Sequence, residues 1–241
     1  RVNLGVALGL AGQPEAALAQ YEWAIAERPS HARAWLHVAL LLRSVGDDQR
    51  ATAAYATAAA NTMDAVEALA IHDGLIAAAQ VESAESMWRR LVAGGDAAKQ
   101  SAVMWAQTLA LLGRTSEARP MLETAATLPD AMAGMALAEL ADGRYDEAVR
   151  WTDRLIASGE SGAAARDRFL TTLQAFEARQ PSVGWTYHLV AQLTLASGQR
   201  EATQAFIELF EGSCADEACR QAAAELRRKA AAATSGPPAE P

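Results

Sequence analysis

The sequence lacks the long apolar run that would cross a membrane. None of its uninterrupted apolar stretches approaches the roughly 18–20 residues that a membrane-spanning helix needs. No signal peptide is visible either. Because Arg1-Val2-Asn3 already has the character of a helix interior, we expect further residues before Arg1, which could carry targeting or anchoring signals. We therefore expect membrane association only through such residues or through a partner.

Patterns typical of strands and of common enzymes are also missing. Runs in which β-branched and polar residues alternate do not occur, whereas 51% of the residues are apolar and many of these are alanine, which favours helix. The sequence contains no Gly-rich loop ending in Gly-Lys-Ser/Thr, no Gly-x-Ser-x-Gly elbow and no His-Glu-x-x-His helix. These absences predict an all-α protein that is not an enzyme.

Side chains suited to binding a metal or stacking on a ligand are few. The four histidines, His31, His37, His72 and His188, are scattered, and a metal site needs three or four ligands that converge on one point. We therefore predict no metal site and no cofactor. Most of the six tryptophans are interpreted as core residues, and Trp185 and Tyr187 are the candidates for an exposed edge.

The charge is of the wrong sign for a general nucleic-acid binder. The formal net charge is −8 and the isoelectric point is about 5.1, whereas nucleic-acid binding relies on a basic face. The basic clusters at Arg89-Arg90 and at 227–229 are interpreted as solvated helix faces. We expect no nucleic-acid partner.

What the sequence does contain is a glycine followed five residues later by an alanine, repeated along the chain. Gly46 and Ala51 form one such pair, between an apolar helical run and a second helical pattern. The alanines that mark the repeats lie at positions 17, 51, 84, 118 and 148, so the successive steps are 34, 33, 34 and 30 residues. A spacing near 34 residues, with a turn between two helices, indicates a helical repeat.

These residues resemble the tetratricopeptide repeat (TPR) family, whose repeat has Trp, Leu-Gly and an aromatic on the first helix and small, bulky and small residues on the second. The second repeat supplies Trp35, Val38, Ala39, Leu42, Gly46, Ala51, Tyr55 and Ala58. The turn from Gly143 to Ala148 is also very close to that of the family. The resemblance implies an all-α fold, a right-handed α-solenoid of TPR helical hairpins with a C-terminal capping helix.

The pattern and its interruption predict five segments. They are five TPR-like repeats at 1–157, the first truncated; a non-repeat helix at 158–182; a degenerate hairpin at 183–212; a capping helix at 213–231; and a disordered tail at 232–241. In the fourth repeat we expect Pro120 in the first turn of the second helix. In the degenerate hairpin the marker alanine is expected at Ala202, one residue short of the usual spacing from Gly198.

In TPR proteins the first helices line a concave surface that usually holds the ligand. The resemblance assigns this role to a largely apolar set: Val6, Leu10, Leu36, His37, Leu40, Arg43, Leu69, Asp73, Ile76, Val103, Gln107 and Leu111. The Lys, Asn and Arg clamp with which chaperone-binding members hold a carboxylate has no counterpart in this set.

Large apolar patches are rarely left bare on monomers, so we expect such a face to be covered. Three covers are considered: an amphipathic helix from a partner, a lipid or membrane-inserted segment, or the chain's own non-repeat helix folded back. The alternative is that the superhelix is tight and these residues are core.

The two cysteines, Cys214 and Cys219, are five residues apart. Within one helix their side chains would point about 140° apart, too far for a disulfide. If Cys214 lies in a turn before the last helix, a disulfide becomes feasible and would favour an oxidising compartment. Otherwise the two are free thiols packed as small hydrophobic side chains.

The sequence therefore predicts a non-enzymatic scaffold that binds an amphipathic helix or an extended segment of a protein partner. By analogy with TPR lipoproteins, we expect a periplasmic or otherwise extracytoplasmic role in assembling a bacterial envelope complex. The alternative function is an accessory subunit held permanently in a large, membrane-bound or soluble complex, and the alternative location is the cytoplasm.

Overall fold

The computed structural model describes residues 1–94, 99–180 and 184–234. In this part of the chain all regular secondary structure is helical, with fourteen α-helices and one short 3-10 helix, so the all-α prediction is confirmed. The chain forms two compact units, Arg1–Leu112 (unit 1) and Gly113–Pro241 (unit 2). Most of the predicted tail, and the predicted junction between the non-repeat helix and the last hairpin, lie outside the described residues.

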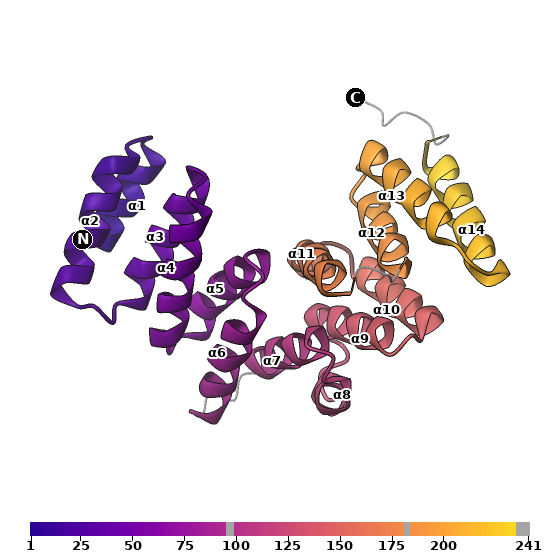
Figure 1. Ribbon diagram of the computed structural model, residues 1–241, viewed down its shortest axis with the longest axis horizontal. Helices are drawn as coiled ribbons and strands as arrows, with labels where there is room; N and C mark the ends of the chain where they lie inside the picture. The colour runs from indigo at the N-terminus through magenta and orange to yellow at the C-terminus, as the bar shows by residue number, and fades with distance from the viewer. Residues whose placement is uncertain (95–98, 181–183, 235–241) are drawn as a thin grey trace. The chain divides into compact units, whose positions relative to one another are not determined.

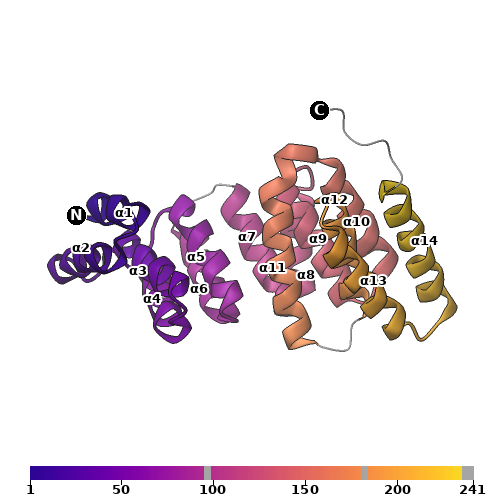
Figure 2. The same ribbon diagram turned by 90° about the horizontal axis from the view of Figure 1, so that it is seen from above.

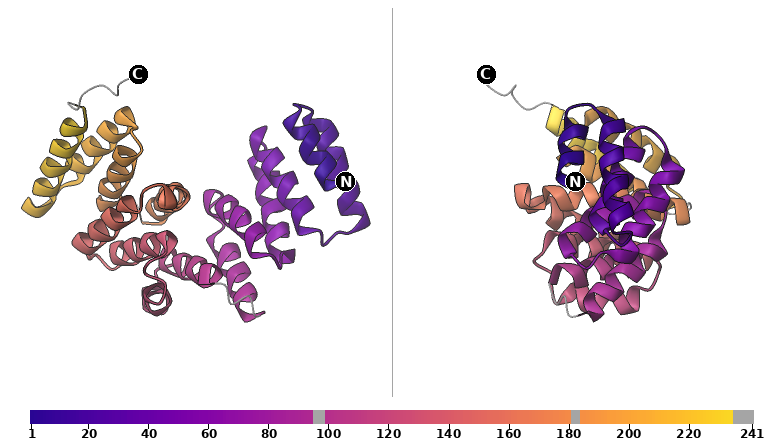
Figure 3. Two further views of the ribbon diagram at one scale, coloured as in Figure 1. Left: turned by 180° about the vertical axis from the view of Figure 1, so that it is seen from behind. Right: turned by 90° about the vertical axis from the view of Figure 1, so that its left-hand side faces the viewer.

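Unit 1 consists of helical hairpins that stack on one another (Figure 1). Its helices are α1 (Val2–Leu10), α2 (Pro14–Glu27), α3 (Ala32–Ser44), α4 (Asp48–Asn61), α5 (Ala65–Ala77), α6 (Val81–Ala93) and α7 (Lys99–Leu111). The pairs α1–α2, α3–α4 and α5–α6 form hairpins, the second helix of each hairpin contacts the first helix of the next, and α7 packs against α6. The view from behind in Figure 3 shows these antiparallel pairs in indigo to purple.

Unit 2 contains two hairpins with an extra helix between them and a further helix at the end. Its elements are α8 (Thr115–Glu123), α9 (Pro129–Ala141), α10 (Tyr145–Ala157), a 3-10 helix (Gly159–Gly162), α11 (Ala163–Arg179), α12 (Trp185–Ala196), α13 (Arg200–Ser213) and α14 (Glu217–Thr234). The pairs α9–α10 and α12–α13 are the hairpins, α8 packs against α9, and α14 packs against α13 and α12. The boundary between the units falls in the turn of the predicted fourth repeat, which assigns α7 to unit 1 and α8 to unit 2.

A left-handed residue followed by a buried small one makes each hairpin turn. Gly12, Gly46, Gly143 and Gly198 have φ angles between 70° and 81°, a conformation that glycine adopts without steric cost. Five residues after the first three of these glycines, the marker alanines are fully or almost fully buried. The spacing read from the sequence therefore corresponds to a turn followed by a close helix contact.

The third hairpin makes the same turn without glycine. Ala79, five residues before the buried Ala84, has φ 57° and is the single non-glycine residue with positive φ in the described residues. Its N–H donates to the carbonyl of Ile76 at 3.0 Å, and the N–H of Gln80 donates to the carbonyl of Leu75 at 2.8 Å. These are the bonds of a Schellman-type helix end, formed here at the steric cost of a left-handed alanine.

The marker position of the last hairpin was predicted wrongly. Ala202 is only half-buried, whereas Thr203 is buried and lies five residues after Gly198, so the usual spacing is kept. The Thr203 hydroxyl donates to the carbonyl of Gln199 at 2.9 Å, which satisfies its polar group inside the contact. Threonine therefore replaces the expected alanine.

The position of Pro120 and the end of the last helix also differ from the prediction. α8 begins at Thr115, so Pro120 lies beyond the first turn, inside the helix, and the helix ends soon afterwards at Glu123. Pro120 has no N–H to donate to the carbonyl of Ser116, so α8 loses one backbone hydrogen bond in its interior. α14 continues to Thr234, so residues 232–234 are helical and not part of a tail; the alanine-rich sequence there favours helix.

Candidate functional site

The predicted groove residues divide into three groups by exposure. Buried are Leu36, Ile76, Val103, Gln107 and Leu111; half-buried are Val6, His37, Leu69 and Asp73; exposed are Leu10, Leu40 and Arg43. A partner cannot reach the buried residues while the helices stay packed, so for those five the structure favours the alternative, that they are core.

Several apolar residues of these first helices are accessible, among them Leu4 on α1 at 48% exposed, and three others are used below. Leu10 on α1 is 87% exposed, Leu40 on α3 is 43% exposed and Val66 on α5 is 78% exposed. Val66 was not in the predicted set, although its place at the start of the third first helix, 18 residues before Ala84, could have suggested it. We call Leu10, Leu40 and Val66 the open face of unit 1.

The corresponding helices of unit 2 carry an extra helix. α11 packs mainly against α9 and α12, the first helices of the two hairpins, and Figure 2 shows it alongside them. It buries Phe169, Leu173 and Phe176. The Arg168 guanidinium donates to both carboxylate oxygens of Asp130 on α9, at 2.9 and 2.8 Å, and this pair is mostly buried. Burial of apolar side chains and the charge-assisted hydrogen bonds from Arg168 to Asp130 therefore hold α11 in place.

One register position shows the difference directly. Leu40 on α3 lies 11 residues before the marker Ala51, and Leu137 on α9 lies 11 residues before the marker Ala148. Leu40 is 43% exposed and Leu137 is 0% exposed. The same residue at the same repeat position is therefore surface in unit 1 and core in unit 2, where α11 packs on its helix.

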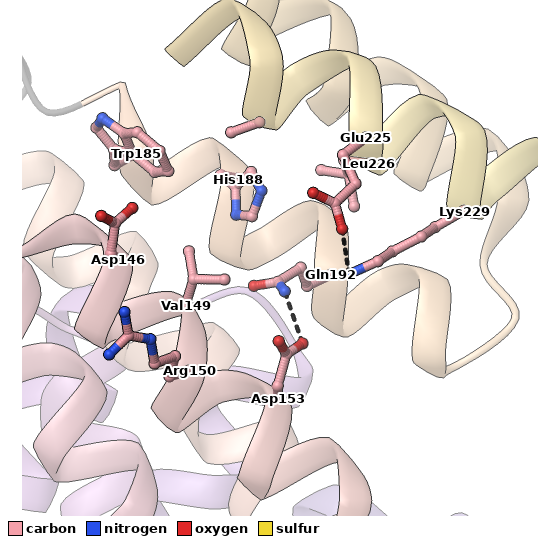
Figure 4. A pocket seen from close by; sticks show the side chains of 11 residues that line it. Asp146, Val149, Arg150, Asp153, Trp185, His188, Gln192, Glu225, Leu226 and Lys229 are labelled. Atoms are coloured by element: carbon pink, nitrogen blue, oxygen red, sulfur yellow. Dashed lines mark hydrogen bonds and ion pairs between the residues drawn. The ribbon is translucent and has the colours of Figure 1, made fainter. Parts of the chain in front are cut away.

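A second candidate site is a polar pocket of about 250 Å³ within unit 2, between α10, α12 and α14 (Figure 4). Its lining residues are Asp146, Val149, Arg150, Asp153, Trp185, His188, Gln192, Ala222, Glu225, Leu226 and Lys229. α12 provides the inner wall, with His188 and Gln192 each 5% exposed. The charged side chains come from α10 and α14 and are exposed at the rim. We call this the α12 pocket.

Two buried polar atoms of the α12 pocket come from residues one helical turn apart. They are Nδ1 of His188 and Oε1 of Gln192, and a side-chain hydrogen bond to Gln192 acts on the imidazole of His188. The amide nitrogen of Gln192 is satisfied, because it donates to Oδ1 of Asp153 at 2.9 Å.

The imidazole of His188 is neutral at pH 7. Burial lowers its pKa to about 4, and the nearby positive charge of Lys229 acts in the same direction. The ring packs edge-on against Phe210, with the centroids 4.9 Å apart, and beside Trp185 at 5.4 Å. Trp185 in turn stacks on Tyr145 at 5.2 Å. A neutral imidazole offers one acceptor nitrogen, held in a fixed orientation by this aromatic cluster.

The cysteine pair lies beside the same pocket. Cys214 directly follows α13, and Cys219 is buried in the first turn of α14; the structure joins their sulfur atoms as a disulfide. Cys219 packs against Phe210 and Ala223, and the N–H of Cys219 is capped by Oδ1 of Asp216 at 2.8 Å. The pair therefore ties the start of α14 to the end of α13.

Sequence reasoning missed the α12 pocket because its walls come from helices far apart in the chain. A local signal was present: Trp185, His188 and Gln192 are spaced three and four residues apart, which places them on one face of a helix. Like His37 on α3 and His72 on α5, His188 lies on the first helix of its hairpin. His72 accepts a hydrogen bond at Nδ1 from the indole N–H of the buried Trp88, at 3.1 Å, which is a core contact.

The described residues contain neither a cluster of metal ligands nor a helix suited to span a membrane. Within residues 1–94, 99–180 and 184–234, no group of three or more His, Cys, Asp or Glu side chains could hold a metal ion. Over the same residues no helix combines the length and the apolar character that a membrane span requires.

Several solved structures resemble the chain, and three of them are as follows. A tetratricopeptide repeat protein from Parabacteroides merdae ATCC 43184 superposes with a TM-score of 0.50 at 15% identity, over 95% of this chain and 97% of that one. PilW, described as a widely conserved type IV pilus biogenesis factor, gives 0.45 at 14% identity, over 88% and 90%. YrrB, described as a TPR protein with an unusual peptide-binding site, gives 0.39 at 18% identity, over 86% and 97%. No protein-family model and no curated protein sequence matches the chain.

Stacked hairpins with a left-handed turn and a buried small residue define a helical repeat protein. The likeness to the Parabacteroides structure identifies the repeat more closely: the chain has the TPR fold, and the resemblance read from the sequence is confirmed at the level of the fold. The fold therefore defines a helical repeat protein of the TPR type.

Proposed function

We propose that the chain is a non-enzymatic scaffold whose open face, Leu10, Leu40 and Val66, binds a helical segment of a partner protein. The partner segment is amphipathic: its apolar side contacts the open face and its polar side stays in water. The scaffold contributes a rigid surface, and specificity lies in which partner helix matches it.

The observation that supports this proposal is the position of α11 in unit 2. In unit 2 a helix from outside the hairpins lies on the first helices α9 and α12, and it is held by three buried apolar residues and the Arg168–Asp130 pair. In unit 1 all the described helices before α7 belong to hairpins, and the apolar residues of the open face are exposed. A partner helix at the open face would make the contacts that α11 makes within its own unit.

The setting that we propose is an oxidising compartment, in assembly of a bacterial envelope complex. The observation that supports it is the Cys214–Cys219 disulfide, since disulfides persist mainly outside the reducing cytoplasm. Alkylation of protein purified from its natural source, followed by intact-mass measurement with and without reductant, tests this. Cysteines that label under denaturant without reductant would point to the cytoplasm instead.

Site-specific photo-crosslinking in the natural host tests the binding surface. A benzophenone side chain placed at Leu40 is expected to give one defined protein adduct, and the same group at the exposed Leu209 on α13 is the matched control. Leu40→Asp should then reduce co-purification of that partner at least about tenfold, because it buries a charge in the contact, while the fold is kept because Leu40 is exposed.

Two outcomes would change the proposal. Undiminished co-purification by Leu40→Asp would remove the open face from the interaction. A partner that is captured but does not exchange with added free partner over hours would favour the second function, a permanently bound subunit of a large complex.

A further inference from the structure

We propose that the cleft between α2 and α4, the second helices of the first two hairpins, binds a helical segment of a protein partner. That segment carries an unbranched apolar side chain and, three residues later, an arginine or a lysine. The cleft has a volume of about 480 Å³, and α3 forms its floor. We call it the α2–α4 cleft. Its lining contains no residue of the open face, so this inference does not depend on the function proposed above.

The next pair of second helices shows what the α2–α4 cleft lacks. α4 and α6 pack against each other, and no comparable contact joins α2 and α4. The marker alanines relate the two places: Ala54 lies three residues after Ala51, and Met87 lies three residues after Ala84. Met87 is 1% exposed, so its long side chain is enclosed, whereas Ala54 lines the cleft. Alanine therefore leaves open the space that methionine takes one hairpin later.

An arginine completes the contact between α4 and α6. The guanidinium of Arg90 donates to the backbone carbonyls of Ala59 and Thr62 at the end of α4, at 2.5 and 2.9 Å. The last carbonyls of a helix lack donors within the helix, so Arg90 supplies them. Thr57 stands at the same distance from its marker alanine as Arg90 does. Its hydroxyl donates to the carbonyl of Ala53 within α4 at 2.9 Å, so it does not serve α2 as Arg90 serves α4.

The end of α2 therefore retains acceptors for a cation. Pro29, four residues after Ile25, has no N–H, so the carbonyl of Ile25 lacks the donor that would follow in a longer helix. Ile25 lines the cleft, as does Glu22 one turn earlier. The cation of the lining, Arg50, lies in the first turn of α4 and pairs with Asp47 at 3.3 Å. A positive charge is favoured at a helix C-terminus, which places the cation of the partner at this end of the cleft.

The floor of the cleft is apolar and includes an indole ring. Val38 and Leu42 of α3 form part of it, together with the half-buried Trp35. The indole N–H of Trp35 donates to the carbonyl of Pro29 at 2.8 Å, which fixes the ring near the end of α2. Indole rings attract both thioether and guanidinium groups. Residues three apart lie on one face of a helix, so a partner helix can present an apolar side chain and a cation together, as α6 does.

The test is an NMR titration of the full chain with three alanine-based helical peptides. The first carries methionine with arginine three residues later, the second has alanine in place of the methionine, and the third has glutamine in place of the arginine. The indole N–H signal of Trp35 reports whether a peptide occupies the cleft. We expect the first peptide to shift this signal with a dissociation constant of about millimolar or below. The second should bind about tenfold more weakly and the third about threefold more weakly.

Two variants close the cleft in different ways. Ala54→Met/Thr57→Arg gives α4 the side chains that α6 has at the same positions, and it should weaken binding of the first peptide at least about tenfold without lowering Tm. Ala53→Lys, at an exposed alanine that lines the cleft, should weaken binding as strongly by crowding the cleft and repelling the cation, and it decides the matter if the double variant does not fold. Ala60→Lys, at an exposed alanine of α4 outside the lining, is the matched control and should bind like the wild type.

Three results would overturn the proposal. They are equal binding of a peptide that lacks methionine or arginine, an unchanged Trp35 signal at 10 mM peptide (about tenfold above the expected constant), and undiminished binding by Ala53→Lys. Self-association of the chain in sedimentation that Ala53→Lys abolishes would assign the cleft to a second copy and overturn it as well. Leu40→Asp must leave the peptide affinities unchanged, so failure here is distinct from failure at the open face.

Discussion

The first helices of the two units are built alike and used differently. α3 in unit 1 and α9 in unit 2 occupy the same place in their hairpins, yet Leu40 on α3 is 43% exposed and Leu137 on α9 is 0% exposed. α11 packs against α9, and the Arg168–Asp130 ion pair joins the two helices. The described helices of unit 1 before α7 all belong to hairpins, so none of them is an extra helix like α11.

The comparison teaches that the repeat does not decide whether its inner face is surface or core. The hairpin supplies an apolar first helix in both units, and in unit 2 a helix from outside the hairpins packs against it. The predictions below test this contrast, beginning with the largest expected effect.

The register-matched leucines provide the most direct test. Leu137→Ala should lower the free energy of unfolding by about 3–4 kcal/mol, because a fully buried leucine leaves a cavity. Leu40→Ala should lower it by less than about 1 kcal/mol, since its side chain is already exposed to water. Urea unfolding of the two variants measures the difference. Equal losses would mean that Leu40 is also core and would remove the contrast.

Acid should destabilise unit 2 through His188. Its pKa is lowered to about 4 in the folded state, against an ordinary value near 6.5, so well above pH 6.5 it is neutral in both states and contributes no pH dependence. As the pH falls from 6.5 to 4, the unfolded chain takes up the proton and the folded chain does not, which lowers the free energy of unfolding by about 3 kcal/mol.

The measurement is urea unfolding of the wild type and of His188→Leu between pH 7 and 4. The difference between the two slopes reports His188 alone. His37 in unit 1, whose pKa is lowered by burial and then by Arg33, is only half-buried and is the natural comparison. A pH dependence that is unchanged in His188→Leu would contradict the assignment.

The disulfide should stabilise unit 2 and leave unit 1 unaffected. It closes a loop with a sequence separation of only 5, so the chain-entropy gain is small, about 2 kcal/mol. Hydrogen exchange with and without reductant should show faster exchange in α14 and unchanged exchange in α3 and α4. The double variant Cys214→Ser/Cys219→Ser is the control, because it should not respond to reductant. Faster exchange throughout unit 1 as well would show that the effect is not confined to α14.

The fold was largely predictable from the sequence because a TPR hairpin is specified locally. A left-handed turn and a small residue five positions later, as at Gly46 and Ala51, determine where two helices meet. The same logic failed at Thr203, because the position requires a small volume rather than alanine itself. Threonine meets that requirement once its hydroxyl bonds to Gln199.

The candidate sites were less predictable because exposure is not local. No property of Leu40 or Leu137 in the sequence shows which one is covered by another helix. The α12 pocket joins α10, α12 and α14, so residues as far apart as Asp146 and Lys229 line one cavity. Only the residues of its inner wall, Trp185, His188 and Gln192, have a helical spacing that the sequence alone shows.

The smallest expected effect concerns the turn that departs from the others. Ala79 has φ 57° where Gly46, in the neighbouring hairpin of the same unit, has φ 81°. Ala79→Gly should raise the free energy of unfolding by up to about 1 kcal/mol, because relief of the left-handed strain exceeds the added entropy of the unfolded chain. Gly46→Ala should lower it by about 1 kcal/mol through strain alone, since an added Cβ would meet nothing within 4 Å. Thermal unfolding of both variants measures the two changes in stability. A loss of stability in Ala79→Gly would contradict the prediction. It would show that the lower chain entropy of alanine in the unfolded state outweighs the strain at this turn.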